Sequence, residues 1–293
     1  MALVLIGAPI DSVGRSGGTE LAPGVLRELG LGEALGAEDR GDLEIRIRGD
    51  ERDPETGLIA SNDVLAATGE IRTAVVGAIA AGDRPLLAGG CCSELPGALG
   101  GARDALGSVG LAYLDGHADL YDGETSTTGE AADMPISVIL GLAPRRWVEV
   151  ARGPSAEAGR IFLVGYRDRD ESIEDGMRQP EDLDPAPWLH PIERVRSDGF
   201  RETGERVAST LSAAGHFWLH LDVDVLDEGA FPATDYLMGG GMSWKELGEL
   251  LPPLLSSDAL IGASIACYNP DKDPERACGR ALVDALRPLR APG

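Results

Sequence analysis

A strand-like run that ends in three polar side chains constrains this chain more than any other feature. Residues 109–114 are apolar enough for a buried strand, and Asp115, His117 and Asp119 follow at a spacing of two. If the extended conformation continues, alternate side chains share a face, so these three point the same way. Two carboxylates and an imidazole then offer oxygen and nitrogen ligands to a divalent ion. The alternative is a solvated, Asp-rich turn with a structural His.

The end of a second strand candidate repeats this pattern. Phe217 to Val223 is apolar apart from His220 and Asp222, and Asp224 follows Asp222 at the same spacing of two. Unpaired carboxylates at the end of a buried strand repel each other and are costly to desolvate, so a cation is their natural compensation. Five donors from two strands suit two metals better than one, because carboxylates can bridge. The two motifs together predict a site for two divalent ions.

Apolar strand candidates recur along the chain, with helical patterns between them. The expected strands are Leu3–Ile6, Leu43–Ile47, Pro85–Ala88, Val109–Leu114, Ile161–Val164, Phe217–Val223 and Leu260–Ala266. The expected helices are Asn62–Ala81, Pro96–Leu106, Met134–Leu142, Gly204–Ala214, Ser243–Leu255 and Arg276–Leu289, and a Gly-rich turn, Gly14–Gly18, leads to another helix that starts near Pro23.

This alternation predicts an α/β fold with three layers, α/β/α, around a mainly parallel central sheet that is covered on both faces. One domain spanning residues 1–293 is expected, because no repeat or linker interrupts the pattern. In such sheets ligands bind beyond the carboxyl ends of the strands, which is where both polar motifs lie.

Composition narrows the range of partners. The formal net charge of −23 argues against binding to nucleic acid or to anionic membrane surfaces. No apolar run reaches the roughly 20 residues that span a bilayer. The N-terminus lacks the basic region of a signal peptide, and four Cys in a chain of 293 residues do not form a disulfide framework. A cytoplasmic protein with a small-molecule substrate is expected.

The motifs resemble those of the ureohydrolase superfamily, which contains the arginases, the agmatinases and their relatives. The DGHAD and HLDVD stretches are similar to the superfamily's DAHxD and SxDxD signatures. Further similar segments follow in the same order as in the superfamily: the opening strand, glycine loop and helix (5–29), PLLAGGCCS beside GGDHS (85–93), the segment after the second Asp pair (231–246) and ACYNPDKD beside EVNPxxD (266–273). The resemblance implies an arginase-like fold and a hydrolase that cleaves a guanidino-like C–N bond, commonly as a trimer or hexamer.

The resemblance also implies a ligand set for two divalent ions, with manganese as the expected metal: Cys92, Asp115, His117, Asp119, Asp222 and Asp224. Asp115 and Asp222 correspond to the bridging residues, and Cys92 stands at the His of GGDHS. A thiolate is softer than an imidazole and favours zinc or iron over manganese. The alternative for Cys92 is a small buried thiol that binds no metal.

The implied chemistry is attack by an activated water molecule on a planar carbon, with Asp119 orienting that water as a hydrogen-bond acceptor. Two residues depart from the superfamily pattern in ways that affect this step. Cys267 stands at the Glu of EVNP, and a neutral thiol cannot make that residue's charge-assisted pair with a guanidinium. Ala132 stands at the His that carries protons.

His220 stands at the Ser of SxDxD and, by strand alternation, faces the same way as Asp222. It therefore either replaces the missing proton carrier or supports a metal ligand from behind. A core His bonded to the backbone is the alternative.

The part of the site that binds the far end of the substrate is also implied by the resemblance. Asp170 corresponds to the Asp that holds a substrate α-amino group, whereas Arg167 and Asp168 are expected to form a structural ion pair. Thr127 and Glu130 fall where the superfamily contacts a substrate carboxylate. Because Glu130 is acidic, it would repel a carboxylate, which argues for a different tail or a displaced loop.

A Cys at the His of GGDHS is also found in the branch of the superfamily that acts on Nω-hydroxy-arginine. The less basic guanidine of that compound depends less on the Glu replaced by Cys267. Nω-hydroxy-arginine is therefore the sharpest substrate hypothesis. The alternatives are hydrolysis of a formimino, ureido or amide group, and a metal-poor pseudoenzyme that binds a guanidino ligand.

Overall fold

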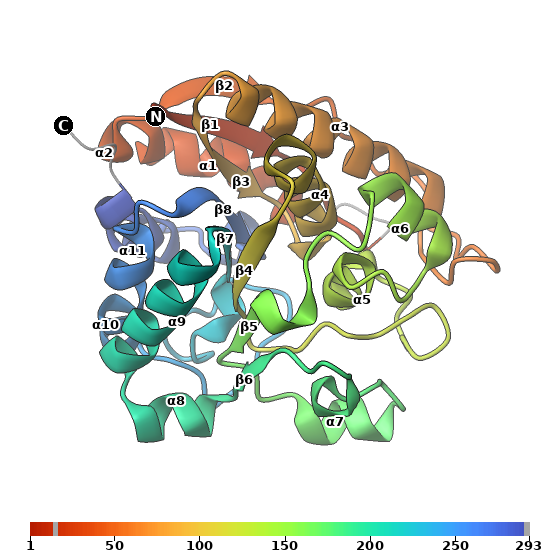
Figure 1. The fold of residues 1–293 in the computed structure, drawn as a ribbon. Helices are drawn as coiled ribbons and strands as arrows, with labels where there is room; N and C mark the ends of the chain where they lie inside the picture. Colours follow the sequence, from red (N-terminus) through yellow and green to blue (C-terminus); the bar gives the residue numbers. More distant parts are fainter. Residues whose placement is uncertain (14–16, 290–293) are drawn as a thin grey trace.

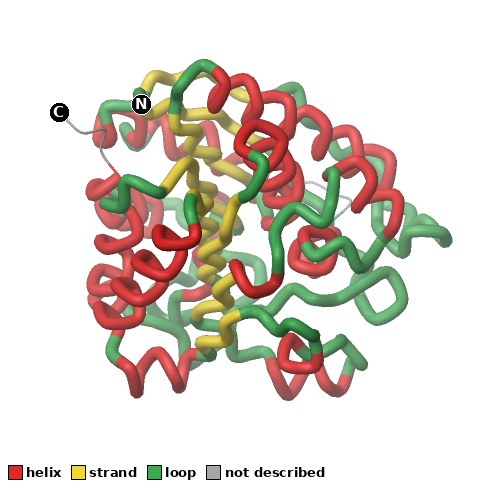
Figure 2. Tube along the Cα trace, viewed as in Figure 1, coloured by secondary structure: helices red, strands yellow, loops and turns green. Residues whose placement is uncertain are grey.

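Eight parallel strands form one sheet in the computed structural model, which describes residues 1–13 and 17–289 (Figures 1 and 2). Their order is β2-β1-β3-β8-β7-β4-β5-β6. The strands are β1 (Leu3–Ala8), β2 (Glu38–Asp42), β3 (Arg84–Gly89), β4 (Val109–Leu114), β5 (Ile161–Val164), β6 (Trp188–His190), β7 (His216–Asp222) and β8 (Leu260–Ala266). Part of the expected Gly-rich turn, residues 14–16, lies outside the described residues.

Helices cover both faces of this sheet, which confirms the three-layer α/β/α arrangement (Figure 1). The α-helices are α1 (Ala22–Glu28), α2 (Leu31–Leu35), α3 (Ser61–Ala80), α4 (Leu95–Leu106), α5 (Pro135–Ile139), α6 (Arg145–Ala151), α7 (Arg169–Glu174), α8 (Ile192–Asp198), α9 (Phe200–Ala214), α10 (Trp244–Leu255) and α11 (Ala277–Ala285). Short 3-10 helices span Thr19–Leu21, Cys92–Glu94, Ala131–Asp133, Ala158–Arg160, Pro180–Asp182, Val223–Val225, Pro270–Lys272 and Arg287–Leu289.

The central strands are apolar on both faces because each face packs against helices. Leu3 and Leu5 of β1 belong to a core shared with α1, α2 and α8 to α11, whereas Val4 and Ile6 belong to a core shared with α3, α4 and α5. Alternate side chains of one strand thus enter opposite layers. Burial of this apolar surface is the main force that holds the three layers together.

Most expected elements are confirmed, and the errors concern one edge strand of the sheet and the end of the last helix. The bounds of β4, β5 and β8 are those expected, and α10 begins with a capping box between Ser243 and Glu246. The expected strand Leu43–Ile47 is wrong, because the charged segment Glu38–Asp42 pairs with β1 instead. Charged side chains suit an exposed edge strand, so a prediction based on apolar residues placed this strand too late in the chain. The last α-helix also ends at Ala285, before the expected Leu289.

The strands that carry the two polar motifs lie side by side at the centre of the sheet. β7 pairs with β4 on one side and with β8 on the other, and β8 pairs with β3. Because all are parallel, their carboxyl ends meet at one edge. Within the described part of the chain, no helix is long and apolar enough to cross a membrane.

Candidate metal centre and active site

Strand register brings the two Asp motifs together. Leu114 of β4 lies opposite Leu221 of β7, so Asp115 and Asp222, the next residues, stand side by side at the ends of their strands. Cys92 begins the short 3-10 helix after β3, and Cys267 follows the last residue of β8. Four adjacent strands therefore deliver their side chains to one point.

The first motif reaches this point by a turn, which corrects the expectation of continued extended backbone. β4 ends at Leu114, and the backbone amide of His117 donates to Asp115 Oδ1 at 2.7 Å. Asp119 has a positive φ of 46°, in the left-handed region that Asp tolerates better than most residues. Hydrogen bonding in a tight loop, rather than strand alternation, thus determines where these side chains point.

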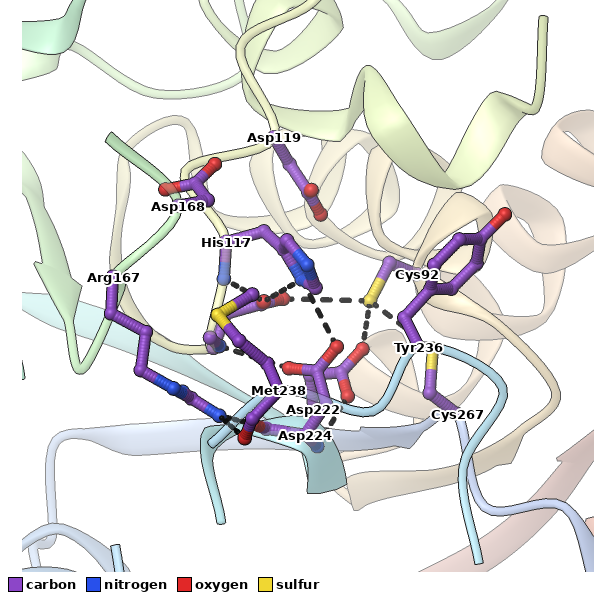
Figure 3. Close-up of polar contacts among 12 residues, drawn as sticks. Cys92, His117, Asp119, Arg167, Asp168, Asp222, Asp224, Tyr236, Met238 and Cys267 are labelled. Carbon is purple, nitrogen blue, oxygen red and sulfur yellow. Dashed lines mark hydrogen bonds and ion pairs between the residues drawn. The ribbon is translucent and has the colours of Figure 1, made fainter. Parts of the chain in front are cut away.

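His117 is surrounded by carboxylates. Its Nδ1 lies 3.1 Å from Asp224 Oδ2 (Figure 3). The same nitrogen lies 3.5 Å from Asp115 Oδ1. The backbone amide of Gly116 donates to Asp224 Oδ1 at 2.9 Å, which holds that carboxylate in place. Together with Asp119, Asp115 and His117 form one group whose ligand atoms lie within 4.8 Å of one another.

A second group surrounds Cys92. Its Sγ lies 2.7 Å from Asp222 Oδ2, 3.6 Å from Asp115 Oδ2 and 3.2 Å from His220 Nε2. The ligand atoms of these four buried residues also lie within 4.8 Å of one another. Asp115 belongs to both groups, which is the position of a bridging ligand.

Asp119 and His220 lie in different groups of the cluster. Asp119 groups with His117 and Asp115, and the hydroxyl of Tyr113 donates to its Oδ2. His220 groups with Cys92 and is completely buried, so it does not line the pocket above the two groups.

The protonation equilibria of the cluster reveal an excess of buried negative charge. Burial, followed by repulsion from Asp224, raises the pKa of Asp115 to about 7. Burial and the same neighbour raise the pKa of Asp222 well above its usual value. Burial disfavours the charged form of His117, but Asp224 and Asp115 outweigh it and raise the His117 pKa.

This donor set fits divalent cations. Carboxylates that repel one another in a buried site lack a positive partner, and the cluster supplies oxygen, nitrogen and sulfur donors at close range. Two groups that share Asp115 match a pair of neighbouring ions.

A pocket opens above the cluster, and its walls are acidic. Residues lining it include Cys92, His117, Asp119, Thr127, Asp222, Asp224, Tyr236 and Cys267, together with Tyr121, Thr128, Ala132, Asp133, Asp168, Glu171 and Asp175. None of these described lining residues is Lys or Arg. A positively charged ligand therefore suits the pocket better than an anionic one.

Only some of the expected substrate-binding residues line the pocket. Thr127 and Cys267 line the pocket, and Glu130 lies at its edge, where it accepts a hydrogen bond of 2.6 Å from the lining residue Tyr236. Asp170 is exposed and does not line this pocket. Asp168 lines it instead, with Oδ2 bonded to the amide of Ala118.

The expected ion pair between Arg167 and Asp168 is wrong. Arg167 donates instead to the backbone carbonyls of Asp224 and Met238 at 2.8 and 2.9 Å (Figure 3). It also donates to the carbonyls of Leu226 and Gly239, both at 3.1 Å. Five donors in a fixed fork suit such a set of carbonyls. Asp168 is thereby left available to the pocket, and its buried Oδ1 has no hydrogen-bond partner among the described residues.

Sequence reasoning missed several residues of this site. Asp133, Glu171, Asp175 and Tyr236 line the pocket from loops, the 3-10 helix Ala131–Asp133 and helix α7, which no strand pattern indicates. It also missed Glu94, a completely buried carboxyl whose two oxygens have no hydrogen-bond partner among the described residues. The position of Glu94, a charged residue two positions after Cys92 and shortly after a buried strand, is the sequence feature that could have indicated it.

A parallel α/β sheet with carboxylates, imidazoles and thiols gathered beyond its central strands has the architecture of a metalloenzyme. The chain belongs to the Arginase family, whose model matches residues 1–289. Homologues in this family are hydrolases that act on C–N bonds in linear amidines. These enzymes typically hold a binuclear metal site.

Individual relatives agree over nearly the whole chain. The arginase of Bacillus subtilis (strain 168) is 28% identical over 97% of this chain and 96% of its own length. The arginase of Brevibacillus brevis is 26% identical over 95% of this chain and 94% of its own. The solved arginase of Bacillus caldovelox has the same fold, with a TM-score of 0.88, 22% identity and coverage of 100% and 99% of the two chains.

Proposed function

We propose that this protein is a metal-dependent amidinohydrolase that cleaves a guanidino-like C–N bond of a positively charged small molecule. The observation that carries the proposal is the convergence of Cys92, Asp115, His117, Asp119, Asp222 and Asp224 beneath one acidic pocket. Two divalent ions held by these residues would make water nucleophilic near neutral pH. Manganese is the expected metal, with zinc or iron as alternatives because of Cys92.

Asp119 is the proposed hydrogen-bond acceptor that orients the attacking water. It lines the pocket, and the hydroxyl of Tyr113 fixes one of its carboxylate oxygens. That bond orients the carboxylate while the other oxygen remains available to accept a hydrogen bond. Tyr113 is buried in β4, so Asp119 is anchored to the sheet despite its position in a loop.

The substrate we propose is an N-hydroxyguanidine with a cationic tail, of which Nω-hydroxy-arginine is an example. Cys267 lines the pocket where a Glu would pair with a full guanidinium, and a neutral thiol suits a less basic group. The acidic wall, including Asp168 and Asp175, suits a substrate amine. Hydrolysis of such a compound adds one water and yields hydroxyurea and an amine.

A substrate screen tests this function. The protein, loaded separately with manganese, zinc or iron(II), is incubated with Nω-hydroxy-arginine, arginine, agmatine and a formimino amino acid, and the released amine, urea and hydroxyurea are measured. We expect fastest turnover with the N-hydroxyguanidine and none from the matched variant Asp222→Asn. Turnover of the formimino compound alone would replace the proposed substrate class. Ligand binding without turnover by metal-loaded protein would instead identify a pseudoenzyme.

We also propose that the protein acts as a homo-oligomer, a trimer or hexamer, in the cytoplasm. Members of the family are often oligomeric. Because the net charge of −23 opposes association, any oligomer should be stabilised by salt. Sedimentation at low and high salt tests this, and a monomer under both conditions would contradict it.

A further inference from the structure

His220 has an unusual place in the site. It lies on β7 two residues before Asp222, so both side chains project from the same face of the strand. The ring is completely buried, and its Nε2 is 3.2 Å from Cys92 Sγ. One nitrogen of the ring lies within 4.8 Å of the Cys92 thiol and of ligand atoms of Asp115 and Asp222. One imidazole nitrogen therefore faces a thiol and two carboxylates.

The opposite edge of the ring is held by the neighbouring strand. His220 Nδ1 lies 2.7 Å from Ser264 Oγ on β8, and Ser264 Oγ accepts a second hydrogen bond of 3.0 Å from Trp218 Nε1. Since a hydroxyl oxygen has two lone pairs, it can accept from both rings. Donation from Nδ1–H to Ser264 leaves the Nε2 lone pair directed at the cluster, as in metal-binding His residues.

Stacking fixes the plane of the same ring. Tyr113 of β4 lies parallel to His220, with ring centroids 5.1 Å apart and an angle of 9° between the planes. Three adjacent strands thus orient this imidazole through Tyr113, Ser264 and its own backbone. Such pre-organisation is what a ligand requires.

From this geometry we propose that His220 is a direct ligand of the ion held by Cys92, and that Cys92, His220, Asp222 and the bridging Asp115 form that ion's ligand set. The inference rests on the proposed metallohydrolase function. The resemblance does not imply a metal ligand at position 220, because the superfamily has Ser there and has its His at the position of Cys92.

Cys92 and His220 both differ from the superfamily pattern, and a transfer of the imidazole ligand from position 92 to position 220 explains both differences. A thiol at 92 is shorter than an imidazole and leaves space above β7, and the ring of His220 fills this space. The number of imidazoles around the two ions is thereby preserved, with one supplied by β7 instead of by the loop after β3. His220 has no exposed surface and does not line the pocket, which argues for a ligand over a carrier of protons to substrate.

Metal binding tests the assignment without reference to turnover. Apoprotein is titrated with zinc or cobalt(II) against a competing chelator, and bound metal is counted. His220→Ser should weaken one of two ions by more than the roughly 10–100-fold that loss of a group behind a ligand costs. It should also remove one imidazole from the X-ray absorption spectrum of the cobalt protein. The matched control His216→Ser, at the exposed start of the same strand, should bind like wild type.

A double substitution tests the transfer itself. Cys92→His alone should bind the ion poorly, because two imidazoles compete for one space. Cys92→His combined with His220→Ser should regain two ions and lose the thiolate-to-cobalt charge-transfer band. If the single Ser variant does not fold, His220→Gln, which retains a polar side chain of similar size, serves in its place.

The outcomes separate the two proposals. Wild-type affinity and an unchanged spectrum in folded His220→Ser would overturn the ligand assignment and leave the metallohydrolase proposal intact. A wild-type protein that takes up neither ion would overturn the metallohydrolase proposal, and the ligand assignment with it.

Discussion

The thiols of Cys92 and Cys267 lie 3.8 Å apart at the base of the pocket, although the two residues are 175 positions apart in the chain. Cys92 follows β3 and Cys267 follows β8, and these strands pair. The backbone amide of Cys267 also donates to the carbonyl of Gly90 at 2.6 Å. The pairing of two strands therefore holds a potential metal ligand beside a second thiol.

We expect peroxide to join these two Cys residues in the metal-free protein. One thiol is oxidised to a sulfenic acid, which condenses with the other thiol and releases water. The sulfurs need only approach from 3.8 Å to the roughly 2.05 Å of a disulfide. Bound metal should protect Cys92. Peptide mapping without reductant detects the link, and Cys267→Ser is the control. Equal oxidation with and without metal would contradict the role of Cys92 as a ligand.

Asp222→Asn should remove both ions yet stabilise the metal-free protein. The substitution replaces a carboxyl group whose pKa is raised by burial and by repulsion from Asp224 and Asp115. The side-chain oxygen of Asn can still accept the hydrogen bond from the backbone N–H of Asp224. We expect the metal-free free energy of unfolding to rise by about 1–3 kcal/mol. Metal analysis and denaturation in chelator check both effects. Retention of two ions would disprove the central role of Asp222.

Glu94→Leu should also stabilise the protein. The Glu94 carboxyl is completely buried, and burial, followed by repulsion from Asp222, raises its pKa well above the usual value. Removal of a buried polar group without a hydrogen-bond partner should raise the free energy of unfolding by about 1–3 kcal/mol. The exposed control Glu124→Leu should change it by less than about 0.5 kcal/mol. A loss of stability in Glu94→Leu would show that Glu94 has a bound partner.

Asp168→Asn should raise KM and leave kcat nearly unchanged. Asp168 Oδ1 is buried in the pocket wall without a partner among the described residues, so a substrate amine can donate to it. Loss of a charge-assisted hydrogen bond costs about 1.5–3 kcal/mol, or roughly 10–100-fold in KM. Asp170→Asn is the matched control, because Asp170 is exposed outside this pocket. The reverse ranking of the two variants would restore Asp170 as the substrate ligand.

His190 should make the metal-free protein less stable in weak acid. Burial, followed by repulsion from Arg194, lowers the pKa of His190 to about 4, against 6.5 in the unfolded chain. The unfolded state therefore binds a proton first, and stability present above pH 6.5 is lost as the pH falls toward 4. We expect His190→Phe to reduce this loss by about 1–2 kcal/mol between pH 7.5 and 5.

Denaturation in chelator at both pH values measures that difference. His216→Phe, the same substitution at an exposed position, is the control. An unaltered slope in His190→Phe would mean that other groups cause the acid sensitivity.

The sequence alone predicts the central strands well for a physical reason. β4, β5 and β8 are buried on both faces, so the apolar run that identifies each strand also determines its ends. The same reasoning failed for residues 43–47, where apolar letters lie in a loop and the charged edge strand β2 precedes them. Edge strands gain their pairing from a neighbour, which local composition does not encode.

Some residues of the candidate site could likewise be predicted from the sequence, and others could not. Asp115, His117, Asp222 and Asp224 were identifiable in the sequence because each follows directly from a strong strand signal. The partner of Cys92 was not, because the contact with His220 depends on which strands are neighbours and on their register. Strand alternation established that His220 and Asp222 share a face, but only the tertiary structure decided that Cys92 meets them there.

The pocket wall shows why such decisions require three dimensions. The resemblance of residues 165–172 to a substrate-binding segment places the substrate contact at Asp170, whereas Asp168 is the residue that lines the pocket. Arg167 binds backbone carbonyls and helix α7 begins at Arg169, so Asp168 enters the pocket wall and Asp170 faces solvent. The sequence determined which chemical groups are available, whereas packing and loop hydrogen bonds decided which of them converge, because both depend on residues far apart in the chain.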